Sequence, residues 1–261
     1  MEPSVWSQSG ASVRFDWGPT GAQRLAVPGG ILVVVDVLSF TTSVGVAVER
    51  GTAVYPAAWR DALAGELAAR EEAVLAVGRR AVSRAHPWSL SPASLRAAPP
   101  VTRLVLPSPN GSTIAAAATA AGIDTVVAAS LRNAPAVGAW LGRAVAHDPR
   151  PVCVVAAGER WPDGSLRPAL EDLLGAGAVI SALLSAARGL VASPEAEAAR
   201  RLHEATADPA AAVRGCASGV ELMSSGFAAD VEVAVEVGTS TAVPVLSDGA
   251  FRAAPALAPS S

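Results

Sequence analysis

Short runs of apolar, largely β-branched residues alternate with helix-forming segments along most of the chain, and this alternation limits the possible folds more than any other feature. Buried strands are predicted at residues 31–36, 52–57, 73–78, 103–106, 124–129 and 151–157. Runs such as ILVVV lack polar residues and are typical of strands covered on both faces, as in parallel sheets. We therefore predict an α/β fold with a parallel-rich mixed sheet covered by helices on both faces, in three layers.

Helical spacing and capping signals place helices between these strands. Helices are predicted at 41–50, 59–72, 134–146 and 168–187, and over the Ala-rich run that ends at Gly122. Ser193-Pro194 and Asp208-Pro209 are typical N-cap and first-turn pairs that begin two more helices.

The remaining segments are less regular. Residues 230–238 alternate as a strand does, and 242–251 could pair with them as a meander. Residues 79–101 have no clear period and are predicted to form an irregular flap or insertion. We expect one domain over residues 1–261, with 252–261 as a loose tail.

Composition excludes several classes of partner. The 261-residue chain is 51% hydrophobic, has a net charge of −3 and contains no lysine or basic cluster, which argues against nucleic-acid binding. Membrane spans need about 18 apolar residues, and every apolar run here is shorter; the N-terminus also lacks a signal-peptide pattern. Cys153 and Cys216 form no metal or disulfide framework, and Cys153 is predicted to be a core residue. We expect a cytoplasmic protein, and the apolar content makes a homodimer plausible.

Polar side chains follow four of the predicted strands, where open α/β sheets bind ligands. These loops carry Asp36 with Ser39, Thr41 and Thr42; Ser108 with Asn110, Gly111 and Ser112; Ser130 with Arg132 and Asn133; and Glu159. The helix that follows Glu159 carries Glu171 and Asp172 in its first turns.

Each of these groups also has a structural explanation. Asn110-Gly111 between apolar runs could form a hairpin turn, but the Ala-rich run after it favours a loop between strand and helix. Such a loop presents backbone N–H groups that suit an anion. Ser112 and Asn133 could simply cap helices, and acids in a first turn complement the helix dipole. Asp36 ends a dry strand, where an unpaired carboxylate is costly, so it is the strongest functional candidate.

Acidic groups without clustered His or Cys indicate a hard, oxygen-ligated ion, which suggests Mg²⁺. An anion-binding loop, carboxylates and Mg²⁺ together suit phosphoryl chemistry. A P-loop is excluded because the chain has no lysine.

Five sequence blocks, in order, resemble the 2-phosphosulfolactate phosphatase family. They read VVVDVLSFTTSV, LPSPNGST, VVAASLRNAPAV, AAGERWPDGSLRPALEDLLGAGAVI and MSSGFAADVEVAVEV. The resemblance implies Mg²⁺-dependent hydrolysis of 2-phospho-3-sulfolactate to 3-sulfolactate and phosphate. It also implies an α/β fold particular to that family. The family's acidic and Asn-Gly motif positions correspond to Asp36, Asn110, Gly111, Asn133, Glu171, Asp172 and Asp230.

One departure concerns charge, because the family commonly has DVLRATT where this chain has DVLSFTT. Ser39 therefore stands where an arginine, a natural ligand for phosphate or sulfonate, is expected. We hypothesise that Arg132 supplies this charge from a neighbouring loop.

The resulting hypothesis is a Mg²⁺-dependent phosphatase acting on a small anionic phosphorylated substrate, with water as the nucleophile. Asp36, Glu171 and Asp172 would act as metal ligands or general base, with Asp230 as a further metal ligand. Phosphoryl oxygens would be held by Asn110, Gly111, Ser112, Ser130, Arg132 and Asn133. Two alternatives remain: a non-catalytic binder of a phosphorylated or sulfonated metabolite on the same fold, and a purely structural protein.

Overall fold

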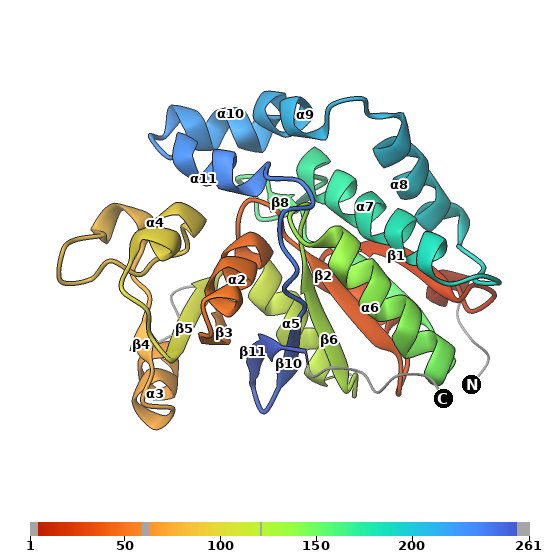
Figure 1. Cartoon of the computed structure of the whole chain (residues 1–261), viewed down its shortest axis with the longest axis horizontal. Coiled ribbons are helices and arrows are strands. Elements are labelled where there is room, and N and C mark those ends of the chain that lie inside the picture. The colour runs from red at the N-terminus through yellow and green to blue at the C-terminus, as the bar shows by residue number, and fades with distance from the viewer. Residues whose placement is uncertain (1–4, 59–62, 121, 255–261) are drawn as a thin grey trace.

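A nine-stranded mixed sheet forms the centre of the molecule, with strand order β1-β7-β2-β6-β10-β11-β3-β5-β4. The structure is a computed structural model that describes residues 5–58, 63–120 and 122–254 (Figure 1). Four strands form one parallel group: β1 (Val13–Trp17), β7 (Val152–Ala156), β2 (Ile31–Val35) and β6 (Thr125–Ala129). A second parallel group contains β3 (Ala53–Ala58), β5 (Arg103–Ser108) and β4 (Val74–Leu75).

An antiparallel hairpin of β10 (Pro244–Ser247) and β11 (Ala250–Ala253) joins the two parallel groups. Its turn contains Asp248 at φ 50° and Gly249 at φ 77°, the two left-handed residues that a type I′ turn requires. The predicted parallel-rich mixed sheet is therefore confirmed, and the hairpin is its antiparallel part.

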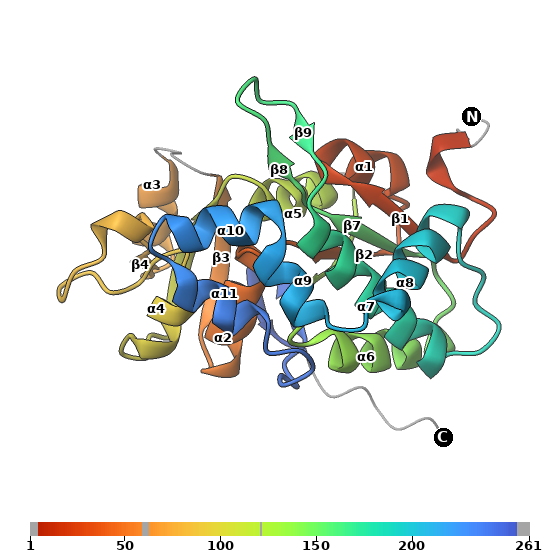
Figure 2. The ribbon, with the colours of Figure 1, turned by 90° about the horizontal axis from the view of Figure 1, so that it is seen from above.

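Helices cover both faces of the sheet, as predicted. Along β2, Ile31, Val33 and Val35 pack in a core with α6 (Ala134–His147), α7 (Leu170–Ala186) and α8 (Pro194–Ala205). Leu32 and Val34 point to the other face and pack in a core with α1 (Gly18–Leu25), α2 (Phe40–Glu49) and α5 (Gly111–Ala120). Figure 2 shows α1 and α5 on one side of β2 and β7, with α6 and α7 on the other. The short α3 (Leu63–Arg70) packs against β5.

Three short helices, α9 (Pro209–Gly215), α10 (Ala217–Ser224) and α11 (Ala228–Ala234), pass over the end of the sheet at which β8 (Glu159–Arg160) begins (Figure 1). The strand predicted at 230–238 is therefore wrong. In α11 the valine and alanine side chains meet cores on two sides: Val231 and Ala234 pack with α6 and α7, and Val233 packs with α2. The predicted meander partner, β10, pairs with β6 instead.

Residues 79–101 are more ordered than a flap without secondary structure. They contain a 3-10 turn, η2 (Arg79–Ala81), and α4 (Pro92–Ala97), which packs against α2 and α11. The other short elements are η1 (Val5–Ser7) and the two-stranded ribbon of β8 with β9 (Leu166–Arg167).

The predicted helix caps and the predicted burial of Cys153 are confirmed, and two other predictions fall partly or wholly outside the described residues. Ser193 and Asp208 cap α8 and α9 by accepting the N–H groups of Ala196 and Ala211. Cys153 is fully buried in the core, as predicted. Residues 59–62 of the predicted helix 59–72 and residues 255–261 of the predicted tail are outside the described part. None of the described helices is both long and apolar enough to cross a bilayer.

Candidate functional site

Asp36 lies directly after β2 and joins the N-termini of two helices. Its Oδ1 accepts the Phe40 N–H of α2 at 3.0 Å, and its Oδ2 accepts the Gly111 N–H of α5 at 3.0 Å. The side chain is only 6% exposed. The loop after β5 and the loop after β2 are therefore held together by one carboxylate.

The Asn110-Gly111 loop approaches Asp36 so closely that only glycine fits. A Cβ on Gly111 would lie 2.9 Å from Asp36 Oδ2, 3.0 Å from Phe40 Cγ and closer still to Phe40 Cδ1. The side-chain Nδ2 of Asn110 donates to Glu159 Oε2 at 3.1 Å. Ser112 Oγ donates to the Ser108 carbonyl at 2.6 Å, a bond local to this loop. The stretch is thus a loop between strand and helix, not a hairpin.

The first turn of α7 brings two more carboxylates to this edge of the sheet. Asp172 Oδ1 accepts the Val37 N–H at 2.7 Å, and Oδ2 accepts the Gly158 N–H at 2.8 Å. Gly158 has φ +66°, a left-handed conformation that lets the chain turn after β7. Glu171 Oε2 accepts the thiol of Cys216 at 3.2 Å. Both carboxylates are nearly fully buried.

The four carboxylates act on one another electrostatically. Burial raises the pKa of Asp36 to about 6, against the lowering effect of the Phe40 and Gly111 N–H groups. Burial, followed by the charges of Glu171 and Asp36, raises the pKa of Asp172 well above its ordinary value. Burial and the same two charges raise the pKa of Glu159 to about 7. We call Asp36, Glu159, Glu171 and Asp172 the acidic cluster. It needs protons or a cation to offset its charge.

Among the described residues, no three His, Cys, Asp or Glu side chains are arranged so that together they could hold a metal ion. The acidic cluster therefore offers oxygen ligands from adjacent loops but not a closed protein cage.

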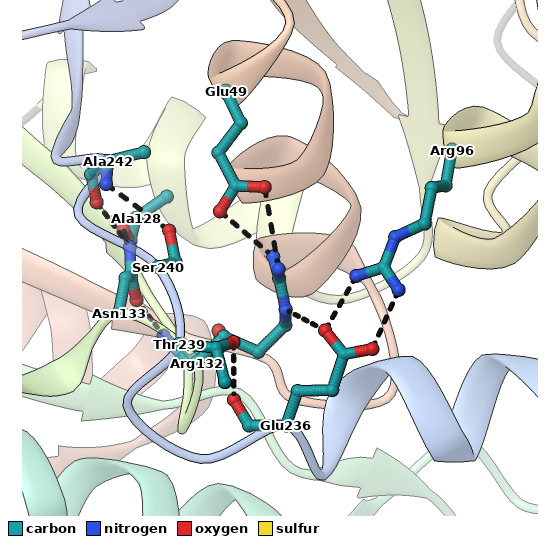
Figure 3. Close-up of polar contacts among 10 residues, drawn as sticks. Glu49, Arg96, Ala128, Arg132, Asn133, Glu236, Thr239, Ser240 and Ala242 are labelled. Carbon is teal, nitrogen blue, oxygen red and sulfur yellow. Dashed lines mark hydrogen bonds and ion pairs between the residues drawn. The ribbon is translucent and has the colours of Figure 1, made fainter.

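The side chains of Arg132 and Asn133 form hydrogen bonds and ion pairs with residues outside the acidic cluster (Figure 3). Arg132 is 5% exposed and pairs with Glu49 at 3.1 Å and with Glu236 at 3.3 Å. Glu49 ends the ten-residue α2, whose first residue binds Asp36, so the two ends lie about 13 Å apart at the α-helical rise. The structure does not favour the hypothesis that Arg132 supplies the cation missing at Ser39, because its guanidinium pairs with Glu49 and Glu236 at the far end of α2.

Asn133 joins backbone segments rather than capping α6 or facing the acidic cluster. Its Oδ1 accepts the Ser130 N–H at 2.8 Å, and its Nδ2 donates to the carbonyls of Ala242 at 3.0 Å and Ala128 at 3.3 Å. These bonds engage its amide, so the predicted phosphoryl contact from Asn133 is not supported. Ser130 follows the β6 residue that pairs with Val35, so it stays beside Asp36 at the sheet edge.

Asp230, predicted as a metal ligand, is instead bound by donors from residues 79–93. Arg79 Nε donates to its Oδ2 at 3.0 Å, the Ser91 hydroxyl donates to its Oδ1, and the Ala93 N–H donates to the same atom at 3.2 Å. The carboxylate is therefore neutralised by an arginine and holds α4 against α11. A metal role for Asp230 is not favoured.

Arg79 and Glu159 are the two groups of interest that the predicted set of site residues did not include. Arg79 Nη2 donates to Ser39 Oγ at 2.7 Å, and its charge lowers the pKa of Asp36. Sequence offered one signal for it, the pair Arg79-Arg80 in a segment without periodicity. The sequence shows Glu159 as a polar residue after a predicted strand, but its electrostatic interaction with Asp36 and Glu171 depends on folding.

Two cavities meet the acidic cluster at Glu159. One, of about 260 Å³, is lined by residues that include Leu38, Arg79, Arg80, Glu159 and Phe227. The other, of about 440 Å³, is lined by Asn110 and Glu159 together with residues of α1 and of the β8–β9 ribbon. A small ligand in either cavity would lie beside Glu159.

The chain is similar in sequence to a phosphatase family and to a protein named as a probable member of it. The sequence model of a family described as 2-phosphosulpholactate phosphatase matches residues 19–249. A protein of Thermus thermophilus, named probable 2-phosphosulfolactate phosphatase, is 32% identical over 227 residues, which cover 86% of this chain and 90% of that protein. The family match includes every residue of the acidic cluster, together with Arg79 and Gly111.

Proposed function

Because the chain belongs to the 2-phosphosulpholactate phosphatase family, we propose that it hydrolyses 2-phospho-3-sulfolactate to 3-sulfolactate and phosphate, with Mg²⁺ as its cofactor. Its family makes it a phosphoric monoester hydrolase.

The observation that supports the proposal best is the buried acidic cluster at the ends of the parallel strands. After burial, the charge of Glu171 raises the pKa of Asp36, and the charges of Glu171 and Asp36 raise the pKa of Asp172, so a divalent cation would stabilise the ionised forms. All four side chains offer oxygen, which is the ligand type that Mg²⁺ prefers. Mg²⁺ usually takes only one or two carboxylates and completes its shell with water and substrate phosphate. An incomplete protein cage therefore fits this ion.

Of Asp36, Glu171 and Asp172, one or two would contact the ion directly, and the rest would act through waters bound to it. When bound, Mg²⁺ supplies charge neutralisation to the phosphoryl oxygens and acidity to a coordinated water. Asp36 and Asp172 are oriented before any ligand arrives, because each accepts two backbone N–H groups from neighbouring loops.

Glu159 is suited to proton transfer. With a pKa raised to about 7, it is partly protonated at neutral pH and lines both cavities. In the proposed reaction a water oxygen bonds to phosphorus and the ester P–O bond breaks. The leaving alkoxide takes the proton of Glu159, and a carboxylate of the acidic cluster accepts the proton of the water.

The test is phosphate release by the purified protein from 2-phosphosulfolactate with Mg²⁺. Asp36→Asn should lower kcat by at least about 100-fold while the protein stays folded. Asp124→Asn is the matched control: Asp124 is an exposed carboxylate just before β6, at the opposite edge of the sheet, and its substitution should leave kcat unchanged. A chelator should abolish activity, and added Mg²⁺ should restore it.

Absence of phosphate release from a broad panel of phosphomonoesters with Mg²⁺ would contradict the proposal. If calorimetry then showed that 2-phosphosulfolactate still binds, the protein would be a non-catalytic binder on the same fold.

A further inference from the structure

Arg79 is a cation held in a fixed orientation at a cavity wall. Its guanidinium donates to Asp230 and to Ser39, and it lies 5.7 Å from the centre of the Phe227 ring. The side chain is 21% exposed, whereas its partner Asp230 is 2% exposed. A guanidinium has five N–H groups, and within the described part of the chain only two of those of Arg79 are engaged. The rest are free to bind a ligand without further ordering of the side chain.

The cavity beside Arg79 links this cation to the acidic cluster. Arg79 and Glu159 both line its volume of about 260 Å³, and the exposed Arg80 adds a second cation. Leu38 and Phe227 supply apolar surface. Glu221 also lines the cavity, but its carboxylate is 77% exposed and lies 4.0 Å from Arg167. A molecule in this cavity would thus meet carboxylates at one part of the wall and a fixed arginine fork at another.

We propose that Arg79 binds the sulfonate of the substrate in this cavity while the phosphoryl group lies at the acidic cluster. The planar guanidinium of an arginine can donate two parallel N–H hydrogen bonds, and these match two oxygens of one sulfonate group. In 2-phosphosulfolactate the carboxylate is attached to the carbon that bears the phosphate, and the sulfonate is one carbon further away. The sulfonate is therefore the anionic group that reaches furthest from the reacting phosphorus. This assignment rests on the proposed function, and it makes Arg79 a specificity residue.

The test compares Arg79→Ala with wild type on two substrates. 2-Phosphosulfolactate has the sulfonate, and 2-phospholactate has the carboxylate but no sulfonate. The variant should raise KM for 2-phosphosulfolactate by about 10- to 100-fold, the worth of charged hydrogen bonds, and change KM for 2-phospholactate by less than about 3-fold. Arg84→Ala is the matched control, because Arg84 is an exposed arginine of the same segment and does not line the cavity. It should leave both KM values unchanged.

A second variant protects the test against misfolding, because Arg79 also holds Asp230. Ser225→Glu places a carboxylate on an exposed position that lines the same cavity. The new carboxylate should compete for Arg79 and produce the same selective loss for 2-phosphosulfolactate.

Three results decide the inference. A selective loss with the sulfonate-bearing substrate supports it. An equal loss with both substrates in folded variants overturns it, because Arg79 would then act on the phosphoryl group. If wild type hydrolyses no phosphomonoester, the proposed function fails, and calorimetry with 3-sulfolactate and lactate decides the inference alone. Binding of 3-sulfolactate that is much tighter than that of lactate, and is lost in Arg79→Ala or Ser225→Glu, supports the assignment; binding that neither variant changes overturns it.

Discussion

Replacing Gly111 by alanine should destabilise the protein by about 1–3 kcal/mol, the usual cost of overpacking a well-packed site, and should abolish phosphatase activity. The added methyl group would lie 2.9 Å from Asp36 Oδ2 and 3.0 Å from Phe40 Cγ. Favourable contacts of carbon lie at about 3.5–4.0 Å, so at least one group must move by about half an ångström or more. Phe40 cannot yield easily, because it is fully buried against Phe251 with ring centres 6.2 Å apart.

The start of α5 must therefore move, because the new Cβ lies closest to Phe40 Cδ1 and a shift of Asp36 alone would not relieve that contact. This movement stretches the 3.0 Å hydrogen bond from the Gly111 N–H to Asp36. The φ angle of Gly111 is not in the left-handed region, so alanine is conformationally allowed there and the cost is steric. Activity should fall further than stability suggests, because the hydrogen bond that is stretched orients Asp36 of the acidic cluster.

Urea unfolding and phosphate release measure the two effects. The matched control is Gly45→Ala in the middle of α2, where a new Cβ would meet nothing within 4 Å. This control should be more stable than wild type by about 0.5–1 kcal/mol, the helix preference of alanine over glycine. The reasoning would be refuted if Gly111→Ala unfolded at the same urea concentration as wild type and kept its kcat.

Two further predictions concern charge. Since burial raises the pKa of Glu159 from 4.5 to about 7, the stability that its proton contributes is present below pH 4.5 and is lost as the pH rises to about 7. In urea unfolding without metal, Glu159→Gln should therefore be more stable than wild type by about 1–3 kcal/mol at pH 8, and equally stable at pH 4. The same stability difference between variant and wild type at both pH values would count against this prediction. Arg132→Ala should cost about 1–2 kcal/mol of stability, because Glu49 and Glu236 are partly exposed. It should leave KM for 2-phosphosulfolactate unchanged, and a raised KM would return Arg132 to the binding site.

Much of the site followed from local sequence. Asp36 ends a strand that is covered on both faces, and a carboxylate at such a place is either paired or functional. Gly111 precedes an Ala-rich run that favours a helix, so a strand-to-helix loop was predictable. Because parallel strands align their carboxyl ends, residues after separate strands were expected to meet, and Asp36, Gly111 and Asp172 do so.

The errors arose where the same local pattern suits two environments. Alternating valines at 230–238 fit a strand, but they also serve a short helix whose faces meet two different cores. Arg132 follows a strand end beside Asp36, yet its long side chain extends to Glu49 and Glu236. The apolar pattern of a strand predicts where that strand ends. The direction of a long polar side chain after it depends instead on which charged groups pack nearby.

The sequence by itself determined the layered α/β architecture and the edge of the sheet at which acids gather. Those properties depend on apolar periodicity and on strand direction, which are local. Only the tertiary structure decided which cation stands beside Ser39. Arg79 lies 40 residues from Ser39 and 151 residues from Asp230, and the three meet where the segment of η2 and α4 packs against α11. No local spacing encodes such a contact, since it forms only when separate helices bury their apolar faces together.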